Sequence, residues 1–361
     1  MKTIFMKKKI LLFAKHQFGQ LTDTYKYAEY SKDLYDLTYL GWDYEIGKQY
    51  LDGIEVIYIS RKGNLFIRNF RLLKSLDVEI KSGKFDLIFA HYVRGISIVK
   101  LLNWNTKIIL DIRTLSISKK VIKRILFNLF LKLESLFFKN KSIISCGVAK
   151  KLRIKNYNLL PVGSDCMRSS EINFNRSNIH LLYVGTLDGR DIIKCVKGFK
   201  KYLLRTNNLE AKLTIVGDSN GLELDEILDY VSRNNLQNNI FCTGRVDHGL
   251  LDFYFSSANI GVSFIPITKW FNFQPPTKTF EYLLSGLPLI ATKTFENIKL
   301  LKDEYYCELI SDTEDEFSEA IYNISFKLKE FVPGIFSDKY NNHLWKEIIE
   351  KYFIQIINRS L

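Results

Sequence analysis

A stretch from Phe273 to Thr292 contains the residue types with the clearest chemistry in this sequence, FQPPTKTFEYLLSGLPLIAT. Its two prolines suit the start of a helix but not its interior, which makes Thr277 the expected N-cap of a helix through Leu284. A glycine and a proline then end the helix before a short buried strand. The unpaired N–H groups and the dipole at the amino end of such a helix attract phosphate or sugar oxygens. Glu281, one turn further in, can accept hydrogen bonds from two vicinal hydroxyls; the alternative is a surface glutamate on an amphipathic helix.

This stretch resembles the nucleotide-sugar motif of family 4 glycosyltransferases, in which Pro-x-Lys-x-x-Glu-Tyr precedes Gly-x-Pro and an aliphatic strand. The resemblance implies that Glu281 holds the ribose of a donor nucleotide and that Thr277 and Lys278 lie beside its diphosphate. Most relatives have a second glutamate eight positions upstream that contacts the donor sugar. Phe273 stands there in this chain, and the neighbouring Gln274 offers an amide in its place.

Three glycine-containing loops follow expected strands earlier in the second half, at Gly185, Gly217 and Gly244. They resemble the family's loops around the donor nucleotide. Where relatives have an arginine in the first of these loops, this chain has Thr186, but Arg190 falls close to a lysine that grips the donor diphosphate. A guanidinium suits bidentate phosphate binding. The alternative is an exposed arginine at the entry to a helix.

Candidate side chains in the first half also follow apolar runs that read as buried parallel strands. Ligands of α/β proteins bind at the carboxyl ends of such strands. Gly19 lies in the loop after the first strand, but there is no GxGxxG or Walker sequence. His91 follows a later strand and resembles a family histidine that faces the donor sugar. Asp111 and Arg113 follow the next strand, at a position resembling the family's acceptor side; a salt-bridged Asp–Arg pair is the alternative.

The length and composition are those of a two-domain globular protein. The chain has 361 residues, of which 47% are hydrophobic and 25% charged. Its five cysteines are scattered without CxxC spacing, which argues against a disulfide framework or a zinc site and favours a reducing compartment. No apolar run is long enough to span a membrane. We therefore expect a cytoplasmic protein, and no metal or further cofactor is predicted.

The resemblance implies the GT-B fold, an α/β architecture of two Rossmann-like domains facing across a cleft. We expect an acceptor-side domain over residues 1–170 and a nucleotide-sugar domain over 171–335. Residues 336–361 then form a helix that crosses back to the first domain. The polar run 168–178 is the predicted linker.

Positive charge is concentrated in the first half. Residues 1–170 contain 31 basic and 14 acidic side chains, whereas the remainder is slightly acidic. Within it, residues 119–140 form an amphipathic helical pattern with an apolar stripe (Val121, Ile122, Ile125, Leu126, Leu129, Phe130, Leu133, Leu136, Phe137) and additional apolar residues (Phe127, Leu131, Phe138). The pattern fits a core helix with a basic outer face, or a helix that lies on an anionic membrane. No nucleic-acid motif accompanies the charge.

Taken together, the sequence resembles a retaining glycosyltransferase of hexosyltransferase type. Such an enzyme moves a sugar from a nucleoside diphosphate sugar to a glycan or lipid-linked acceptor. The expected setting is bacterial cell-surface polysaccharide synthesis on the inner face of the membrane. Two alternatives remain open: a sugar-nucleotide epimerase of the same fold, and a non-catalytic protein that binds nucleotides or anions.

Overall fold

The computed structural model describes residues 7–118, 120–168, 176, 178–332 and 334–361. It divides the chain into two compact units, each with its own parallel sheet. The first unit comprises Met1–Gly163 and Trp345–Leu361, and the second comprises Ser164–Leu344. Most of the predicted linker at 168–178 lies outside the described residues.

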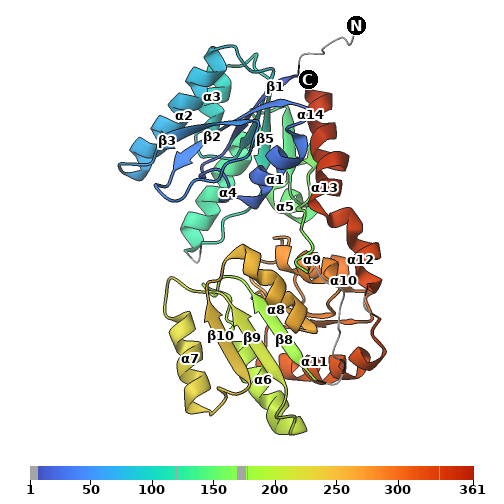
Figure 1. Ribbon diagram of the computed structural model, residues 1–361. Helices are drawn as coiled ribbons and strands as arrows, with labels where there is room; N and C mark the ends of the chain where they lie inside the picture. The colour runs from blue at the N-terminus through green and yellow to red at the C-terminus, as the bar shows by residue number, and fades with distance from the viewer. Residues whose placement is uncertain (1–6, 119, 169–175, 177, 333) are drawn as a thin grey trace. The chain divides into compact units, whose positions relative to one another are not determined.

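The first unit contains a parallel sheet with the strand order β3-β2-β1-β4-β5-β6-β7 (Figure 1). The chain therefore builds outward from β1 in one direction and then from β4 in the other, which is the doubly wound arrangement. The strands are β1 (Lys9–Phe13), β2 (Asp36–Asp43), β3 (Ile54–Ser60), β4 (Leu87–His91), β5 (Ile108–Ile112), β6 (Asn140–Ile143) and β7 (Asn158–Leu159). The helices are α1 (Thr22–Ser31), α2 (Leu65–Lys81), α3 (Ile96–Leu102), α4 (Val121–Ser135) and α5 (Cys146–Leu152).

The end of the chain completes the first unit. Helix α13 (Trp345–Ile348), a π-helical turn (Ile349–Phe353) and α14 (Ile354–Ser360) form one continuous segment beside α1 (Figure 1). The rings of Tyr27 and Phe353 stack with their centroids 4.5 Å apart. Tyr35 donates a 2.7 Å hydrogen bond to the Asn358 side chain. The predicted return of the C-terminal helix to the first unit is confirmed, but the returning segment begins at Trp345 rather than at residue 336.

The second unit contains a parallel sheet with the strand order β10-β9-β8-β11-β12-β13. Its strands are β8 (His180–Val184), β9 (Lys212–Val216), β10 (Ile240–Gly244), β11 (Ile260–Ser263), β12 (Leu289–Thr292) and β13 (Cys307–Ile310). Its helices are α6 (Ile193–Thr206), α7 (Glu223–Arg233), α8 (Leu251–Ser257), α9 (Thr277–Leu284), α10 (Phe295–Leu301), α11 (Glu314–Lys327) and α12 (Ile335–Tyr340). Short 3₁₀ turns lie at His248–Leu250, Leu328–Glu330 and Asn341–His343. The predicted α/β fold with two Rossmann-like sheets is confirmed.

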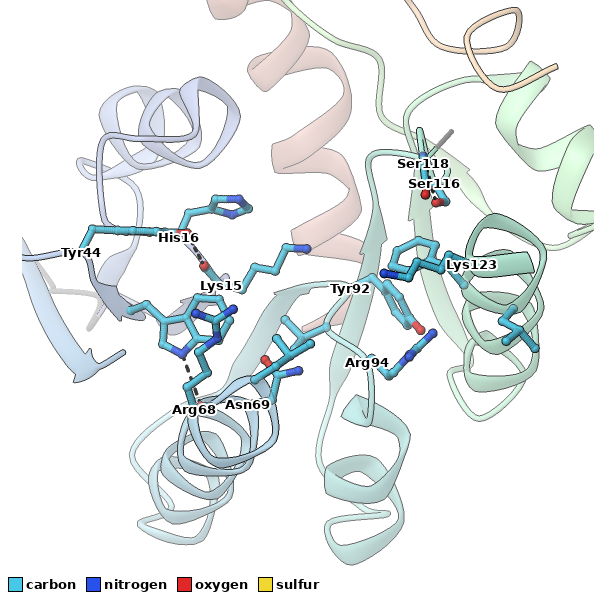
Figure 2. Close-up of a pocket in the computed structure, with 15 residues that line it drawn as sticks. Lys15, His16, Tyr44, Arg68, Asn69, Tyr92, Arg94, Ser116, Ser118 and Lys123 are labelled. Carbon is cyan, nitrogen blue, oxygen red and sulfur yellow. Dashed lines mark hydrogen bonds between the residues drawn. The ribbon is translucent and has the colours of Figure 1, made fainter. Parts of the chain in front are cut away.

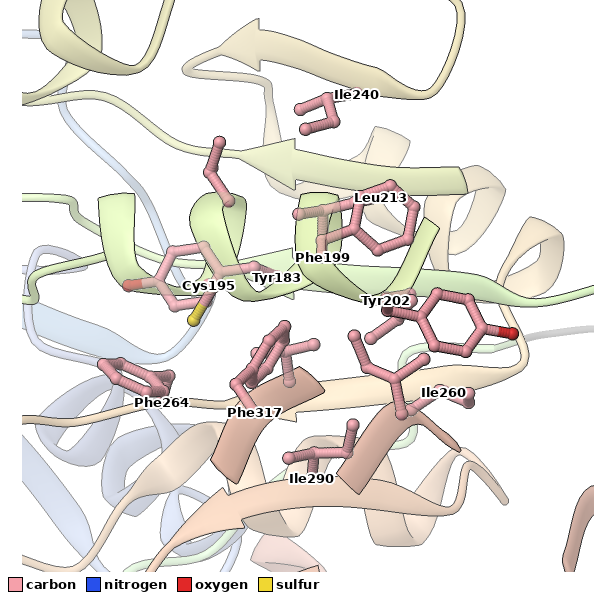
Figure 3. Packing of buried hydrophobic residues seen from close by; sticks show 14 of the residues in the cluster. Tyr183, Cys195, Phe199, Tyr202, Leu213, Ile240, Ile260, Phe264, Ile290 and Phe317 are labelled. Carbon is pink, nitrogen blue, oxygen red and sulfur yellow. The ribbon is translucent and has the colours of Figure 1, made fainter. Parts of the chain in front are cut away.

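Aromatic and aliphatic side chains fill the core between this sheet and helices α6 and α11. Figure 3 shows Phe199 and Tyr202 of α6 with Phe317 of α11 among the strand side chains, and all three are buried. Both faces of a parallel sheet must be covered, which is why its strands are apolar almost without alternation. The continuous runs in the sequence reflect this burial.

Strands β8 and β11 are neighbours at the point where the strand order of the second unit reverses. Tyr282 of α9 is fully buried there, and its hydroxyl accepts a 2.9 Å hydrogen bond from the Val184 backbone N–H. The ring fits because Gly261 of β11 has no side chain: a Cβ atom at that position would overlap it. Helix α9 is thereby fixed against the two central strands.

We therefore expect the substitution Gly261→Ala to destabilise the second unit by about 1–3 kcal/mol, because the added methyl group forces Tyr282 to move. Urea unfolding followed by circular dichroism should show a lower midpoint. Gly249→Ala is the matched control, since a Cβ there has no heavy atom within 4 Å. Equal midpoints for the two variants would contradict this account of how α9 is held.

Candidate functional site

Helix α9 begins at Thr277, as predicted, but its N-cap is Pro276 rather than Thr277. The prediction of the cap was wrong because proline already fixes an extended conformation just before the first turn. Thr277 is instead an exposed residue of that turn, and no side chain caps the helix.

A buried polar network attaches the start of α9 to the ends of two strands. The hydroxyls of Ser263 and Thr279 lie 2.7 Å apart, and Thr279 also donates to Asn297 Oδ1 at 3.0 Å. Asn297 in turn donates to the Thr292 carbonyl at 2.9 Å. Because every one of these groups is buried and paired, the network is rigid. It presents the first turn of α9 at the carboxyl edge of the sheet.

Glu281 and Lys278 form an ion pair on that turn. Lys278 Nζ lies 2.5 Å from Glu281 Oε2, and Glu281 is 9% exposed. A carboxylate that is this well covered is largely shielded from water, and the helix fixes the position of its oxygen atoms. The arrangement leaves a paired carboxylate and ammonium beside the helix start, where hydroxyl and phosphate groups can both be recognised.

Arg190 lies on the loop after β8, and Phe271 lies on the loop after β11. The guanidinium sits over the Phe271 ring at 4.3 Å. Burial lowers the pKa of Arg190, and the nearby Tyr183 only partly opposes this effect. No carboxylate among the described residues pairs with it. Arg190 is therefore a half-buried arginine without a carboxylate partner, at the point where the strand order reverses, and its role toward a donor diphosphate stays a prediction.

The three predicted glycines lie at the ends of adjacent strands. Gly217 donates its N–H to the Gly244 carbonyl at 2.9 Å, and Gly185 donates to the Val216 carbonyl at the same distance. A Cβ on Gly217 would overlap the Gly185 carbonyl oxygen. Gly244 has a left-handed φ of 68° and open space around it. These loops keep backbone rather than side chains at the carboxyl edge of β8, β9 and β10.

Phe273 occupies the position of the family's upstream glutamate and packs on Phe295, with ring centroids 5.3 Å apart. Gln274 follows it, half-buried, with its backbone N–H bonded to the Phe271 carbonyl. The structure therefore has an aromatic pair where relatives place a carboxylate. A role for Gln274 toward the donor stays a prediction.

In the first unit, His91 and Asp111 lie side by side at the ends of β4 and β5. His91 is 7% exposed and Asp111 is fully buried. His91 Nε2 lies 3.1 Å from Asp111 Oδ2, but the angle is not that of a hydrogen bond. The other oxygen of Asp111 accepts a 2.7 Å hydrogen bond from Ser142. The structure brings this predicted pair together in the interior, and its role in catalysis stays a prediction.

Arg113 pairs chiefly with Asp23 of α1 rather than with Asp111. Its Nε is 2.5 Å from Asp23 and 3.9 Å from Asp111, and one Nη donates to the Leu160 carbonyl at 2.6 Å. Burial acts to lower the pKa of Arg113, but Asp23, Tyr27 and Asp111 outweigh it, and the pKa is raised. The alternative of a salt-bridged arginine therefore describes this side chain, with a partner from another element.

Gly19 lies in the loop after β1 with a left-handed φ of 86°. The side chain of Gln49 fills the space that a Cβ would need. The close approach that requires glycine here is one between two loops of the first unit. Binding at Gly19 stays a prediction.

A cavity of about 630 Å³ opens at the carboxyl edge of the first unit's sheet, between α2 and α4 (Figure 2). Its basic lining residues are Lys15, His16, Arg68, Arg94 and Lys123. Its aromatic and aliphatic lining residues are Trp42, Tyr44, Tyr92, Phe127, Leu65 and Leu126. Sequence reasoning located the loops after β1 and β4 but missed the contributions of β2 and α2. The apolar and aromatic run LTYLGW at 37–42 is the signal that could have revealed β2.

The apolar stripe of α4 faces outward, which does not fit the alternative of a core helix with a basic outer face. Leu131 is fully buried and Phe138, just beyond the helix, nearly so, whereas Ile122 is 74% exposed. The remaining stripe residues are also exposed (Val121, Ile125, Leu126, Leu129, Phe130, Leu133, Leu136, Phe137). Residues outside the stripe thus contact the core, while the stripe residues stay exposed. No helix among the described residues combines the length and apolar composition needed to cross a membrane.

The second unit also carries a recognisable family pattern: residues 178–325 match the family model "Glycosyl transferases group 1". This segment of the second unit is similar to group 1 glycosyl transferases. The match begins at β8 and ends within α11, so the matched segment contains every loop and helix end described above for this unit. A comparison with curated proteins found no match.

Solved structures resemble the chain over nearly its full length. A sucrose-phosphate synthase from Thermosynechococcus elongatus has a TM-score of 0.76 at 16% identity, covering 98% of this chain and 99% of that one. Anabaena Alr3699/HepE in complex with UDP has a TM-score of 0.70 at 12% identity, covering 98% and 100%. A trehalose-6-phosphate protein from E. coli bound with UDP-2-fluoro glucose has a TM-score of 0.70 at 8% identity, covering 97% and 99%. At these identities the likeness establishes the GT-B fold.

His16, which lines the cavity of the first unit, should make the stability of the protein depend on pH. Burial, then Lys15, His91 and Arg61, lowers the pKa of His16 from 6.5 to about 4. Between these values the unfolded chain binds a proton that the folded chain excludes. The contribution of His16 is therefore present above pH 6.5 and is lost as the pH falls toward 4, at no more than about 1.4 kcal/mol per pH unit.

The free energy of unfolding in urea, measured at about pH 7 and about pH 5, should fall less for His16→Gln than for the wild-type protein. Burial also lowers the pKa of His180 and His343, so part of the fall should remain in the variant. An unchanged pH slope in His16→Gln would show that His16 is not held neutral by the fold.

Proposed function

We propose that the protein is a retaining glycosyltransferase that uses a nucleoside diphosphate sugar as its donor. The second unit binds the donor, and the first unit binds a glycan or lipid-linked acceptor. Arg190 is the observation that carries the proposal, because a half-buried arginine without a carboxylate partner needs an anion. The diphosphate of a nucleotide sugar is an anion of suitable charge. The neighbouring glycine loops leave room for the diphosphate oxygens to approach the protein backbone.

The residues of the second unit suggest how the departing group is stabilised. When the bond between sugar and diphosphate breaks, negative charge grows on the diphosphate oxygens. Arg190 and the first turn of α9, with Lys278, provide fixed positive charge for it. Glu281 accepts hydrogen bonds from the ribose hydroxyls, which sets the position of the nucleotide. Binding of UDP by Alr3699/HepE and of a UDP-sugar by the E. coli protein supports a uridine nucleotide as the first donor to test.

The test is calorimetric titration of UDP and of GDP into the wild-type protein and into Glu281→Ala. We expect one nucleotide to bind the wild-type protein, and the substitution to weaken it by about tenfold or more, because charge-assisted hydrogen bonds to the ribose are lost. Arg190→Gln should weaken the same nucleotide and should affect its nucleoside much less, since only the diphosphate is expected to meet that side chain.

Glu210→Ala is the matched control for Glu281→Ala. Glu210 is exposed and precedes β9, at the opposite edge of the same sheet, so its removal should leave nucleotide binding unchanged. No binding of either nucleotide would sink the transferase proposal. Binding without sugar transfer to any acceptor would favour the non-catalytic alternative, and conversion of the donor sugar without an acceptor would favour the epimerase.

We further propose that the first unit works at an anionic membrane surface, in the synthesis of a bacterial cell-surface polysaccharide. The outward apolar stripe of α4 and its flanking basic residues support this proposal. Basic residues attract anionic headgroups, and exposed aliphatic and aromatic side chains insert at the boundary of the acyl chains.

Co-sedimentation with vesicles containing anionic phospholipid tests the membrane proposal. We expect Ile122→Gln to reduce the bound fraction severalfold, because it removes the most exposed side chain of the stripe. Leu204→Gln, at a 75% exposed position on α6 of the second unit, is the control and should bind like wild type. Equal loss in both variants, or no binding by the wild-type protein, would contradict membrane contact through α4.

A further inference from the structure

The cavity of the first unit contains several cations and no acidic side chain. Lys15, Arg68, Arg94 and Lys123 all line it. None of the four forms an ion pair with a carboxylate among the described residues. In Figure 2, Lys15 and Lys123 extend into the space from opposite sides. Four positive charges around one cavity repel each other, so a bound anion would relieve a real electrostatic cost.

The two arginines of the cavity lie over aromatic rings rather than beside carboxylates. The Arg68 guanidinium lies 5.5 Å from the Trp42 ring, and the Arg94 guanidinium lies 4.7 Å from the Phe130 ring. Arg68 Nε is buried and has no hydrogen-bond partner. Stacking on a ring orients a guanidinium but leaves its N–H donors available. The cavity therefore presents at least one donor, Arg68 Nε, that has no hydrogen-bond partner among the described residues.

Glu134 of α4 fixes the wall that carries Arg94. Its carboxylate accepts hydrogen bonds from the backbone N–H groups of Gly95 and Ser97 at 2.9 and 3.2 Å, and one from the Tyr92 hydroxyl at 3.1 Å. Both oxygens of the one acidic side chain of α4 thus accept hydrogen bonds from residues at or just before the start of α3. Among the described residues this carboxylate forms no ion pair with a cation that lines the cavity.

The cavity is continuous with the outward apolar surface of the first unit. Leu126 lines the cavity and belongs to the exposed stripe of α4, and Leu65 lines it from α2 and is exposed as well. Phe66, the next residue along α2, is 88% exposed. If the charged end of a molecule binds between α2 and α4, the part of that molecule that extends out of the cavity would thus contact apolar side chains.

We propose that this cavity binds the phosphate or diphosphate of a lipid-linked acceptor, with the apolar chain leaving across Leu126 and Leu65. The inference rests on the proposed transferase function and narrows its acceptor to a phosphorylated amphiphile. The cavity's roughly 630 Å³ falls within the usual range of small-molecule sites. Its four cations without carboxylate partners favour a ligand with an anionic head group. Its apolar rim favours a phosphate that carries an apolar chain over free phosphate.

Three small molecules can distinguish the contribution of the phosphate head group to binding from that of the apolar chain. We would titrate octyl phosphate, inorganic phosphate and octyl glucoside into the full-length protein, each below the concentration at which it forms micelles. Octyl phosphate should bind about tenfold or more tightly than either partial probe, since only it offers both a charge and a chain. Equal binding of octyl phosphate and inorganic phosphate would reduce the site to a free-anion site and overturn the proposal.

Matched pairs of variants on α4, one inside the cavity and one outside it, test whether octyl phosphate binds in the cavity. Lys123→Gln should weaken octyl phosphate about tenfold, whereas Lys132→Gln, the same change on the same helix outside the cavity, should not. Leu126→Ser should weaken octyl phosphate and leave inorganic phosphate unchanged, whereas Leu129→Ser, an equally exposed stripe residue that does not line the cavity, should change neither. If each matched pair responds alike, the amphiphile binds the general surface and the proposal fails.

Nucleotide binding in the same variants separates this inference from the function on which it rests. Lys123→Gln should bind the donor nucleotide like wild type, because Lys123 lies in the other unit from Glu281. Normal nucleotide binding with no binding of octyl phosphate would overturn the acceptor inference alone. Loss of nucleotide binding in the wild-type protein would instead remove the transferase proposal.

Discussion

The requirement that both faces of a parallel sheet be covered governs this structure. The inner strands of each sheet are buried on both sides, so helices must lie on each face and the chain must leave the sheet at its carboxyl edge to reach them. Where the strand order reverses, neighbouring loops leave in opposite directions and open a space. In the second unit that point lies between β8 and β11, and Arg190 and Phe271 come from its two loops. In the first unit the cavity lies beside the corresponding pair, β1 and β4.

Both of these edges retain positive charge that the protein does not neutralise. Elsewhere cations find partners, as Arg113 does in Asp23. At the edges, Arg190, Arg68 and Arg94 rest on aromatic rings. A ring restricts a guanidinium without satisfying its donors, whereas a carboxylate would compete with any anionic ligand. The choice of aromatic support over ion pairing is therefore a physical sign of a binding site that is independent of sequence resemblance.

The sequence predicted the parts of this structure that depend on local pattern. Continuous apolar runs located β1, β4 and β8, and the prolines and Gly286 located α9 to within a residue. Contacts between distant segments had no such signal. Nothing near Arg113 in the sequence indicates that Asp23 is its partner, and nothing near Gly261 indicates that the Tyr282 ring will lie against it. The basic lining of the cavity was visible only as an excess of charge, because its members come from four separate segments.

Helix α4 shows why periodicity alone cannot assign the buried face of a helix. The widest apolar stripe would normally be assigned to the core, since burying it lowers the free energy most. Here the core accepts only the narrow face that carries Leu131 and Glu134, because Glu134 must reach the backbone N–H groups at the start of α3. A buried carboxylate with four N–H and O–H donors is costly to turn outward, so it fixes the rotation of the helix. The aliphatic stripe is then left on the surface, where only a partner outside this unit can cover it.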